Sequence, residues 1–300
     1  LYADSITMQS NNHRLRIVRF IADSISQSCT TSNQLIFCPL PSTLDGGGSM
    51  ERNVSSLAIV LHSQRYGQLN RRLKLLSVDY GIIDVISYGA RKSLKSVKAE
   101  VFTDAQFFLY YNPVKKDYTL KDAEVVATHD DIRDDLVRTY CALLFCELVL
   151  KTNGGESAGE YQLLSTALDL LSEAPLYSDR ILIQFIHRLT DLLGLRTDLS
   201  SCPICEREYG QQEVLSFSSA LSCPCCSECA SLESNMLLPP GARRYLVATS
   251  SLGYEESVLV ELSPTATSRI KNYLLRYAQI ITGGTLKTLS AGILQGAADQ

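Results

Sequence analysis

The sequence predicts an α+β protein: an N-terminal five-stranded β-barrel followed by an α-helical domain that carries a four-cysteine zinc module. Three observations predict it. Apolar residues follow a β pattern from about residue 55 to residue 127, helical periodicity dominates after residue 130, and six of the ten cysteines lie between residues 202 and 229. With 45% hydrophobic and 20% charged residues, 300 residues are enough for two or three domains with real cores.

Five segments in the first part are rich in β-branched and aromatic residues and are bounded by Gly, Asn, Asp or Pro, which is typical of strands. They are residues 58–61, 69–78, 82–88, 101–111 and 118–126. A closed barrel is the economical arrangement because closure hides the strand edges, and five strands suit a barrel of the OB type. We expect this OB-fold domain to span residues 50–129.

The rest of the chain, residues 130–300, is expected to form the helical domain. Asp130 or Asp131 can cap a first helix. Its expected apolar face is Leu136, Val137, Tyr140, Leu143, Leu144 and Leu148. Residues 161–171 and 179–193 repeat Leu and Ile at helical spacing, and Pro239–Pro240 opens another segment. A last helix is expected over residues 265–281. Its side chains that face the core would be Ile270, Tyr273, Leu274, Tyr277 and Ile280.

Residues 1–49 are rich in Ser, Thr, Asn and Gln and end in a glycine-rich run before Met50. We expect them to be an upstream extension, disordered or not native, with Met50 as the true start. An authentic extension stays open, because Leu15, Val18, Ile21 and Ile25 have helical spacing.

The cysteine-rich stretch contains two CxxC elements about twenty residues apart, the spacing of a four-thiolate zinc site. The expected ligands are Cys202, Cys205, Cys226 and Cys229. Cys223 with Cys226 forms a competing CxxC, and a thiol cluster without metal is the third reading. A closed tetrahedron supports structure rather than catalysis.

The sequence lacks an export signal in its first residues and an apolar run of about 18 residues. We therefore expect a cytoplasmic protein that does not enter membranes, with cysteines that serve as metal ligands rather than disulfides.

Positive charge gathers in the β region between Arg65 and Lys98. The cluster consists of Arg65, Arg71, Arg72, Lys74, Arg91, Lys92, Lys95 and Lys98. Only Asp79 and Asp84 oppose it in this window, although the whole chain has a net charge of −4. A basic loop on a small barrel suits phosphate backbones; the competing interpretation is a solvated face without a partner.

Catalytic motifs are missing, since the chain has no phosphate-binding loop, no GxGxxG and no GxSxG. His187 is interpreted as structural. Asp130, Asp131, Asp134 and Asp135 are interpreted as the acidic first turn of a helix rather than a Mg²⁺ site. We expect a protein that is not an enzyme.

The order of barrel, basic loop, helices and cysteine module resembles the bacterial recombination-mediator family RecO, from about Met50 nearly to the end. Local strings resemble it too: Tyr80-Gly81 leading to Tyr88-Gly89-Ala90-Arg91-Lys92, and Leu192-Leu193-Gly194-Leu195 just before Cys202. Phe217-Ser218 ahead of Cys226 and the closing Leu286-Lys287-Thr288-Leu289 are similar as well. The family often has glycine where this chain has Glu206 and, approximately, Ser222-Cys223, which puts the turn geometry in doubt.

The resemblance implies a DNA repair and recombination mediator that binds single- and double-stranded DNA without cutting it and anneals complementary strands. It implies that the protein is associated with the nucleoid. The implied partners are the C-terminal tail of single-strand-binding protein (SSB), RecR and, indirectly, RecA, with the eight basic residues as DNA contacts. For the acidic tail of SSB, Arg138, Arg188 and Lys271 or Arg276 are the candidates.

Two other functions compete. A zinc-ribbon, OB-fold RNA-binding or translation-related factor would share the barrel and the zinc module. A zinc deaminase would need a His-x-Glu element, which this chain lacks.

Overall fold

A computed structural model describes residues 52–89, 99–152, 157–196, 198–230 and 236–295. Residues 52–300 belong to one compact unit. The expectations for residues 1–49 and for the basic loop at residues 91–98 lie outside the described residues.

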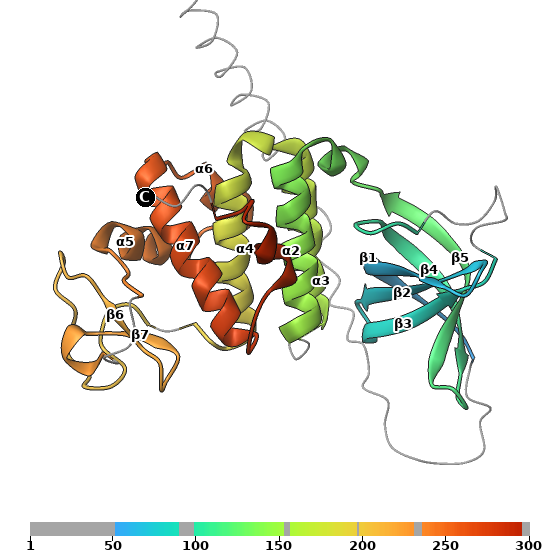
Figure 1. Cartoon of the computed structure of the whole chain (residues 1–300), viewed down its shortest axis with the longest axis horizontal. Coiled ribbons are helices and arrows are strands. Elements are labelled where there is room, and N and C mark those ends of the chain that lie inside the picture. Colours follow the sequence, from blue (N-terminus) through green and yellow to red (C-terminus); the bar gives the residue numbers. More distant parts are fainter. Residues whose placement is uncertain (1–51, 90–98, 153–156, 197, 231–235, 296–300) are drawn as a thin grey trace, which may run out of the picture. The chain divides into compact units, whose positions relative to one another are not determined.

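Five strands form a closed barrel in the order β1-β2-β3-β5-β4, which confirms the predicted fold (Figure 1). The strands are β1 (Asn53–Tyr66), β2 (Asn70–Ser77), β3 (Gly81–Ser87), β4 (Asp104–Asn112) and β5 (Asp117–Ala127). Neighbours are antiparallel except for β3 and β5, whose parallel pairing closes the barrel.

Strand β1 is much longer than the four-residue segment that the sequence predicts, because it serves two cores. Ala58 and Val60 are buried inside the barrel, whereas the alternate residues Ile59 and Leu61 join the core of the helices. The period of two along a strand puts successive side chains on opposite faces. The barrel is therefore packed against the helices through apolar contacts.

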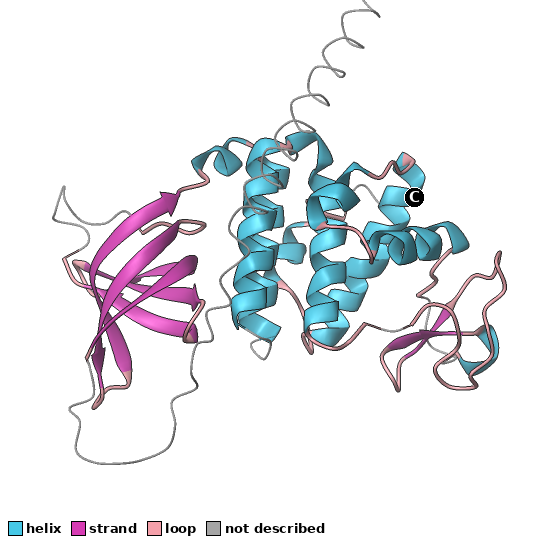
Figure 2. Ribbon diagram, turned by 180° about the vertical axis from the view of Figure 1, so that it is seen from behind, coloured by secondary structure: helices cyan, strands magenta, loops and turns pink. Residues whose placement is uncertain are grey.

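The helices follow the barrel, and Figure 2 shows the strands confined to the barrel and to a small hairpin. The helical elements are η1 (Asp130–Asp134), α2 (Leu136–Thr152), α3 (Ser157–Glu173), η2 (Pro175–Tyr177), α4 (Ser178–Leu192), α5 (Pro240–Thr249), α6 (Tyr254–Leu259), α7 (Pro264–Ile281) and η4 (Lys287–Ala291). Between α4 and α5 lies the cysteine module, with β6 (Ser216–Ser218), β7 (Cys223–Cys225) and η3 (Ser227–Cys229).

The first helix departs from the prediction at its start. Residues 130–134 form a 3-10 turn, and the carboxylate of Asp135 accepts a hydrogen bond of 2.8 Å from the Arg138 amide to begin α2. Asp130 and Asp131 therefore do not cap the α-helix.

The predicted apolar face of α2 is correct only in part: Leu144 and Leu148 are fully buried, whereas Leu136, Val137 and Leu143 are exposed. Leu136 is 61% exposed, whereas Phe145 is fully buried and stacks on Phe185 with ring centroids 4.0 Å apart. Helix α2 is apolar nearly all round, so periodicity could not choose its buried side. At the other end of the fold, Ile280 on α7 is 38% exposed rather than inward.

In the described part of the chain, no helix combines the length and the apolar character needed to cross a membrane.

Candidate metal centre and basic strip

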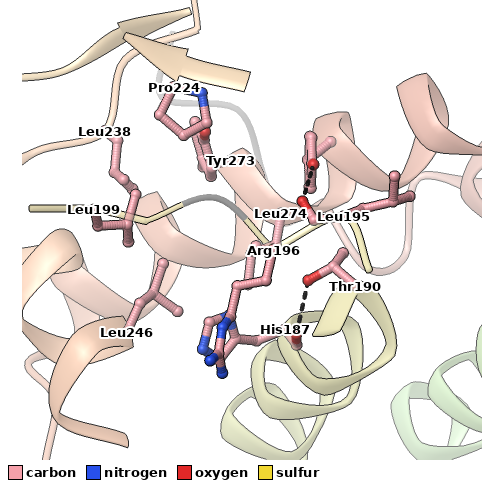
Figure 3. Close-up of a pocket in the computed structure, with 11 residues that line it drawn as sticks. His187, Thr190, Leu195, Arg196, Leu199, Pro224, Leu238, Leu246, Tyr273 and Leu274 are labelled. Carbon is pink, nitrogen blue, oxygen red and sulfur yellow. Dashed lines mark hydrogen bonds between the residues drawn. The ribbon is translucent and has the colours of Figure 1, made fainter. Parts of the chain in front are cut away.

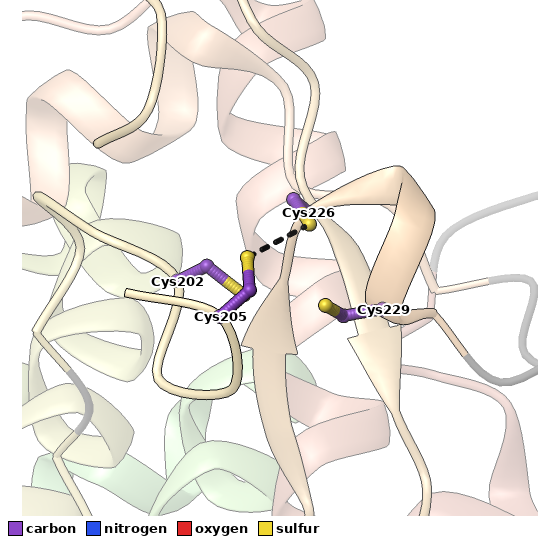
Figure 4. A group of neighbouring side chains, drawn as sticks. All are labelled: Cys202, Cys205, Cys226 and Cys229. Carbon is purple, nitrogen blue, oxygen red and sulfur yellow. Dashed lines mark hydrogen bonds between the residues drawn. The ribbon is translucent and has the colours of Figure 1, made fainter. Parts of the chain in front are cut away.

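Four cysteine sulfurs converge at the cysteine module (Figure 4). The Sγ atoms of Cys202, Cys205, Cys226 and Cys229 all lie within 4.8 Å of one another, and those of Cys205 and Cys226 are 3.8 Å apart. Zn–S bonds of 2.3 Å in a tetrahedron place the sulfurs about 3.8 Å apart, so the arrangement fits zinc. Among the described residues, no other group of three or more His, Cys, Asp or Glu side chains converges in this way.

Backbone hydrogen bonds shape the two turns that carry these thiols. The amide of Glu206 donates to the carbonyl oxygen of Cys202 (2.8 Å), and the amide of Cys229 donates to that of Cys226 (3.1 Å). The strands β6 and β7 pair as a hairpin directly before Cys226. Each CxxC therefore forms a closed turn with both sulfurs on one side.

Cys223 and Cys225 are buried next to this group but lie outside it. The arrangement thus brings Cys229 to the other three thiols in preference to Cys223, the alternative that the sequence leaves open.

Two turn positions of the module have left-handed backbone conformations. Glu206 has φ 62° and Ser222 has φ 51°, in the region that favours glycine. These are the positions at which the sequence departs from the glycines of the family it resembles. The turns form nevertheless, at the cost of backbone strain.

The surroundings of Cys202 favour its thiolate form. Burial opposes ionisation of Cys202, but hydrogen bonds from the backbone of Cys226, Cys205 and Ile204 outweigh it and lower the pKa of Cys202 to about 6. Thiolates, not thiols, bind metals. The geometry and the donor set together form a closed site with no position left open for a substrate.

The described part of the basic cluster lies on β1 and β2 and is partly neutralised. Arg72 and Lys74 both contact Asp84 at 3.3 Å, and Arg71 lies 3.6 Å from Glu100. Arg65 is exposed and lies opposite Arg71 in the register of β1 and β2. We call Arg65, Arg71, Arg72 and Lys74 the basic strip. The sequence count missed Glu100, which lies just outside the window from Arg65 to Lys98.

The ion pairs of the basic strip leave its cations partly accessible. The side chains of Arg72 and Lys74 are 43% and 40% exposed. Ion pairs at the surface contribute only about 0–1 kcal/mol, so these pairs hold their cations weakly.

Three of the four cations suggested for an acidic peptide are already engaged. Lys271 contacts Asp179 (2.9 Å), Arg188 donates to the carbonyl oxygen of Leu252 (2.8 Å), and Arg138 lies 3.5 Å from Asp131. The fourth cation, Arg276 on α7, has an exposed side chain.

Arg276 borders an open hollow of about 390 Å³. The hollow is also lined by Gln279, Ile280, Gly284 and Thr285.

A second cavity, of about 40 Å³, lies between α4, α5, α7 and the cysteine module (Figure 3). Its lining includes His187, Thr190, Leu246, Pro224 and Tyr273. A volume of this size holds one or two waters rather than a side chain.

The residues that could have suggested catalysis have structural contacts. His187 is buried, with Nε2 3.0 Å from the Ser250 hydroxyl, and burial, together with Arg196 and Arg188, lowers its pKa to about 4. Asp130 contacts Arg133 at 2.6 Å.

Comparison with known proteins agrees with this architecture. Residues 50–129 match the family model described as Recombination protein O N terminal, and residues 133–290 match the model described as Recombination protein O C terminal. The chain is 28% identical to the DNA repair protein RecO of Bacillus pumilus over 244 residues, which cover 78% of this chain and 91% of that protein.

Two further relatives have the same name. The DNA repair protein RecO of Symbiobacterium thermophilum is 26% identical over 236 residues, covering 77% of this chain and 92% of that protein. That of Heliobacterium modesticaldum is 34% identical over 151 residues, covering 49% and 54%.

Proposed function

The chain belongs to the Recombination protein O family, whose curated relatives are DNA repair proteins, and from this premise we propose that it is a non-catalytic mediator of recombination. In this role it binds single- and double-stranded DNA through the barrel and anneals complementary strands, including strands coated with SSB. It helps to load RecA together with RecR.

The observation that carries the proposal is the basic strip on a closed barrel. Annealing requires that the repulsion of two phosphate chains be neutralised, and it breaks no covalent bond. Cations whose present partners are surface carboxylates, such as the partly exposed Asp84 and the exposed Glu100, can exchange those partners for phosphates at modest cost. A barrel of this kind needs no catalytic groups for the task.

Zinc is proposed as a structural staple of the helical part. Cys202, Cys205, Cys226 and Cys229 would hold it, and the metal would supply a cross-link between the two turns of the module. A site with four protein ligands leaves no coordination position for a substrate, which fits a protein without turnover.

The charge of the cysteine module argues against the competing RNA-binding function. Residues 198–230 contain five carboxylates and one guanidinium, a net charge of −4, and four thiolates around Zn²⁺ would add a further −2. Such a module repels phosphates, whereas a zinc ribbon that binds RNA needs basic side chains on its surface.

The hollow beside Arg276 is the proposed site for the acidic tail of SSB. The tail combines carboxylates with an apolar end, and the hollow combines the Arg276 guanidinium with the 38% exposed side chain of Ile280. Arg138, Arg188 and Lys271 are less suited, because each already has a partner within the fold.

The test is annealing of complementary oligonucleotides, naked or coated with cognate SSB, at several salt concentrations. We expect annealing that weakens as salt rises. Reversing Arg65 and Arg71 to Glu should slow it on both substrates and flatten the salt dependence by roughly one unit of log-log slope for each lost phosphate contact.

Arg276→Glu is the matched control, because it reverses one exposed arginine far along the chain from the basic strip. It should slow annealing only when SSB coats the strands. Stronger binding of structured RNA than of single-stranded DNA would contradict the proposal.

A further inference from the structure

A single histidine occupies the junction between the barrel and the helices. Strand β5 ends at Ala127, η1 begins at Asp130, and His129 lies between them with φ 52° and ψ 37°. Histidine is one of the few residues other than glycine that adopt this left-handed conformation with some frequency. The junction is therefore short, and its geometry directs the His129 ring inward, where the side chain is 3% exposed.

Both ring nitrogens of His129 face oxygen atoms that only accept hydrogen bonds. Nδ1 lies 2.8 Å from the carbonyl oxygen of Phe102, in the segment before β4, and Nε2 lies 2.9 Å from a carboxylate oxygen of Asp169 on α3. A neutral imidazole has one donor and one acceptor, whereas the protonated ring donates from both nitrogens. The contacts are complete only for the imidazolium.

Acidic groups face the His129 ring from the barrel and from α3. Asp104 on β4 is 3% exposed, and its carboxylate accepts hydrogen bonds from the hydroxyls of Tyr161 (2.8 and 2.9 Å) and Ser165 (3.3 Å). Asp169 and Glu173 are the titratable groups that face it from α3. The neighbouring turn η1 adds Asp130, Asp131 and one cation, Arg133, whose guanidinium lies 5.5 Å from the centroid of the Phe102 ring and donates to the Val101 carbonyl oxygen at 2.6 Å.

These neighbours set the protonation equilibrium. Burial disfavours the charged ring, but the hydrogen bonds to Asp169 and Phe102 and the charges of Asp169 and Asp104 outweigh burial and raise the pKa of His129 above its ordinary value. Burial also raises the pKa of Asp104, against the hydrogen bonds from Tyr161 and Ser165.

We propose that His129 is a positioning residue that, in its protonated form, locks the barrel onto α3, and that deprotonation releases this junction. The lock connects Phe102 on the barrel side with Asp169 on the helical side through one charged ring. Loss of the proton leaves one of the two oxygens facing a ring nitrogen that no longer donates, beside a ring that is only 3% exposed.

The direction of the pH dependence follows from the raised pKa. A histidine whose pKa is higher in the folded state contributes its full stabilisation below about pH 6.5, its value in the unfolded chain. The contribution is lost as pH rises through the raised pKa of the folded protein. The lock is therefore closed in mildly acidic solution and opens with increasing alkalinity.

The consequence for DNA rests on the proposed function, but the lock itself does not. A change in annealing with pH that is present in the unaltered chain and absent from His129→Asn would report a change in the position of the barrel.

The experiment is a titration of the full chain followed by NMR of the histidine ring nitrogens, combined with amide exchange measured as protection factors for residues 99–104 and 128–133. We expect a His129 midpoint above 6.5, two protonated ring nitrogens below the midpoint, and protection factors that fall at least tenfold as pH rises through it. Asp169→Asn keeps an acceptor of the same shape without the charge, and it should lower the midpoint and the protection at pH 7.

The matched control is Asp191→Asn on α4, which removes a carboxylate of similar exposure (52% against 54%) from its ion pair with Arg196. It should leave the midpoint of His129 and both segments unchanged. His129→Asn tolerates the backbone conformation and removes the titrating group, so its protection factors should no longer depend on pH.

A His129 midpoint at or below 6.5, or protection that is independent of pH in the unaltered protein, would overturn the proposal. If the protein failed to bind DNA at any pH, the proposed function would fail while the lock could still be measured.

Discussion

Replacing Glu206 with glycine should tighten the metal centre, because the change relieves backbone strain in the first turn of the cysteine module. Glu206 has φ 62°, and its amide closes this turn by donating to the Cys202 carbonyl. The left-handed conformation costs a residue with a side chain about 1–2 kcal/mol. Glycine avoids this cost but loses about 0.5–1 kcal/mol more conformational entropy on folding. The net gain for Glu206→Gly is about 0.5–1 kcal/mol.

That gain should appear as metal affinity, since folding of a small metal module is coupled to metal binding. At 1.4 kcal/mol for each factor of ten, zinc should bind about two- to fivefold more tightly. Competition with a chromophoric chelator measures this ratio directly. Ser222→Gly, at φ 51° in the other loop, should act in the same direction and add to the first change.

Glu206→Ala is the control, because alanine removes the carboxylate but keeps the left-handed strain. If alanine tightened zinc binding as much as glycine, the cause would be the charge of Glu206 near the thiolates, and the backbone reasoning would be refuted.

Two other predictions concern the cysteines and the buried histidine. Substituting Ser for Cys226 or Cys229 should abolish stoichiometric zinc binding, whereas Cys223→Ser and Cys225→Ser should still bind one zinc per chain. Metal analysis of the purified proteins measures this. If Cys229→Ser kept its zinc and Cys223→Ser lost it, Cys223 would replace Cys229 as the ligand. His187, whose pKa is lowered to about 4 mainly by burial, is neutral in the folded protein. Because this pKa is lower in the folded protein, the contribution of His187 to the free energy of unfolding is complete above about pH 6.5. It falls by about 3 kcal/mol in total as pH decreases toward 4. Denaturant unfolding of His187→Gln should show a smaller loss over this range than the unaltered chain, and equal losses would show that His187 does not titrate in the folded state.

Much of the fold could be predicted because it depends on local patterns. The five strands follow runs of β-branched and aromatic residues, and α3, α4 and α7 follow clear apolar stripes. The four thiols could be named in advance because a CxxC turn confines two sulfurs to one side of a loop.

The remaining features depend on contacts between residues far apart in sequence. The buried side of α2 is chosen by the stack of Phe145 on Phe185, since the helix itself is apolar nearly all round. The charge of the basic strip is reduced by Asp84 and Glu100, which only strand pairing and loop position bring near.

The chain by itself therefore determined its strands, most of its helices and its candidate metal ligands, since these follow from periodicity and short-range spacing. Only the tertiary structure decided how the barrel and the helices are joined. At the junction, His129 contacts two oxygen atoms that come from positions 27 residues before it and 40 residues after it. No local pattern reports such a contact, because the protonation of a histidine is set by the atoms that surround it in the folded protein.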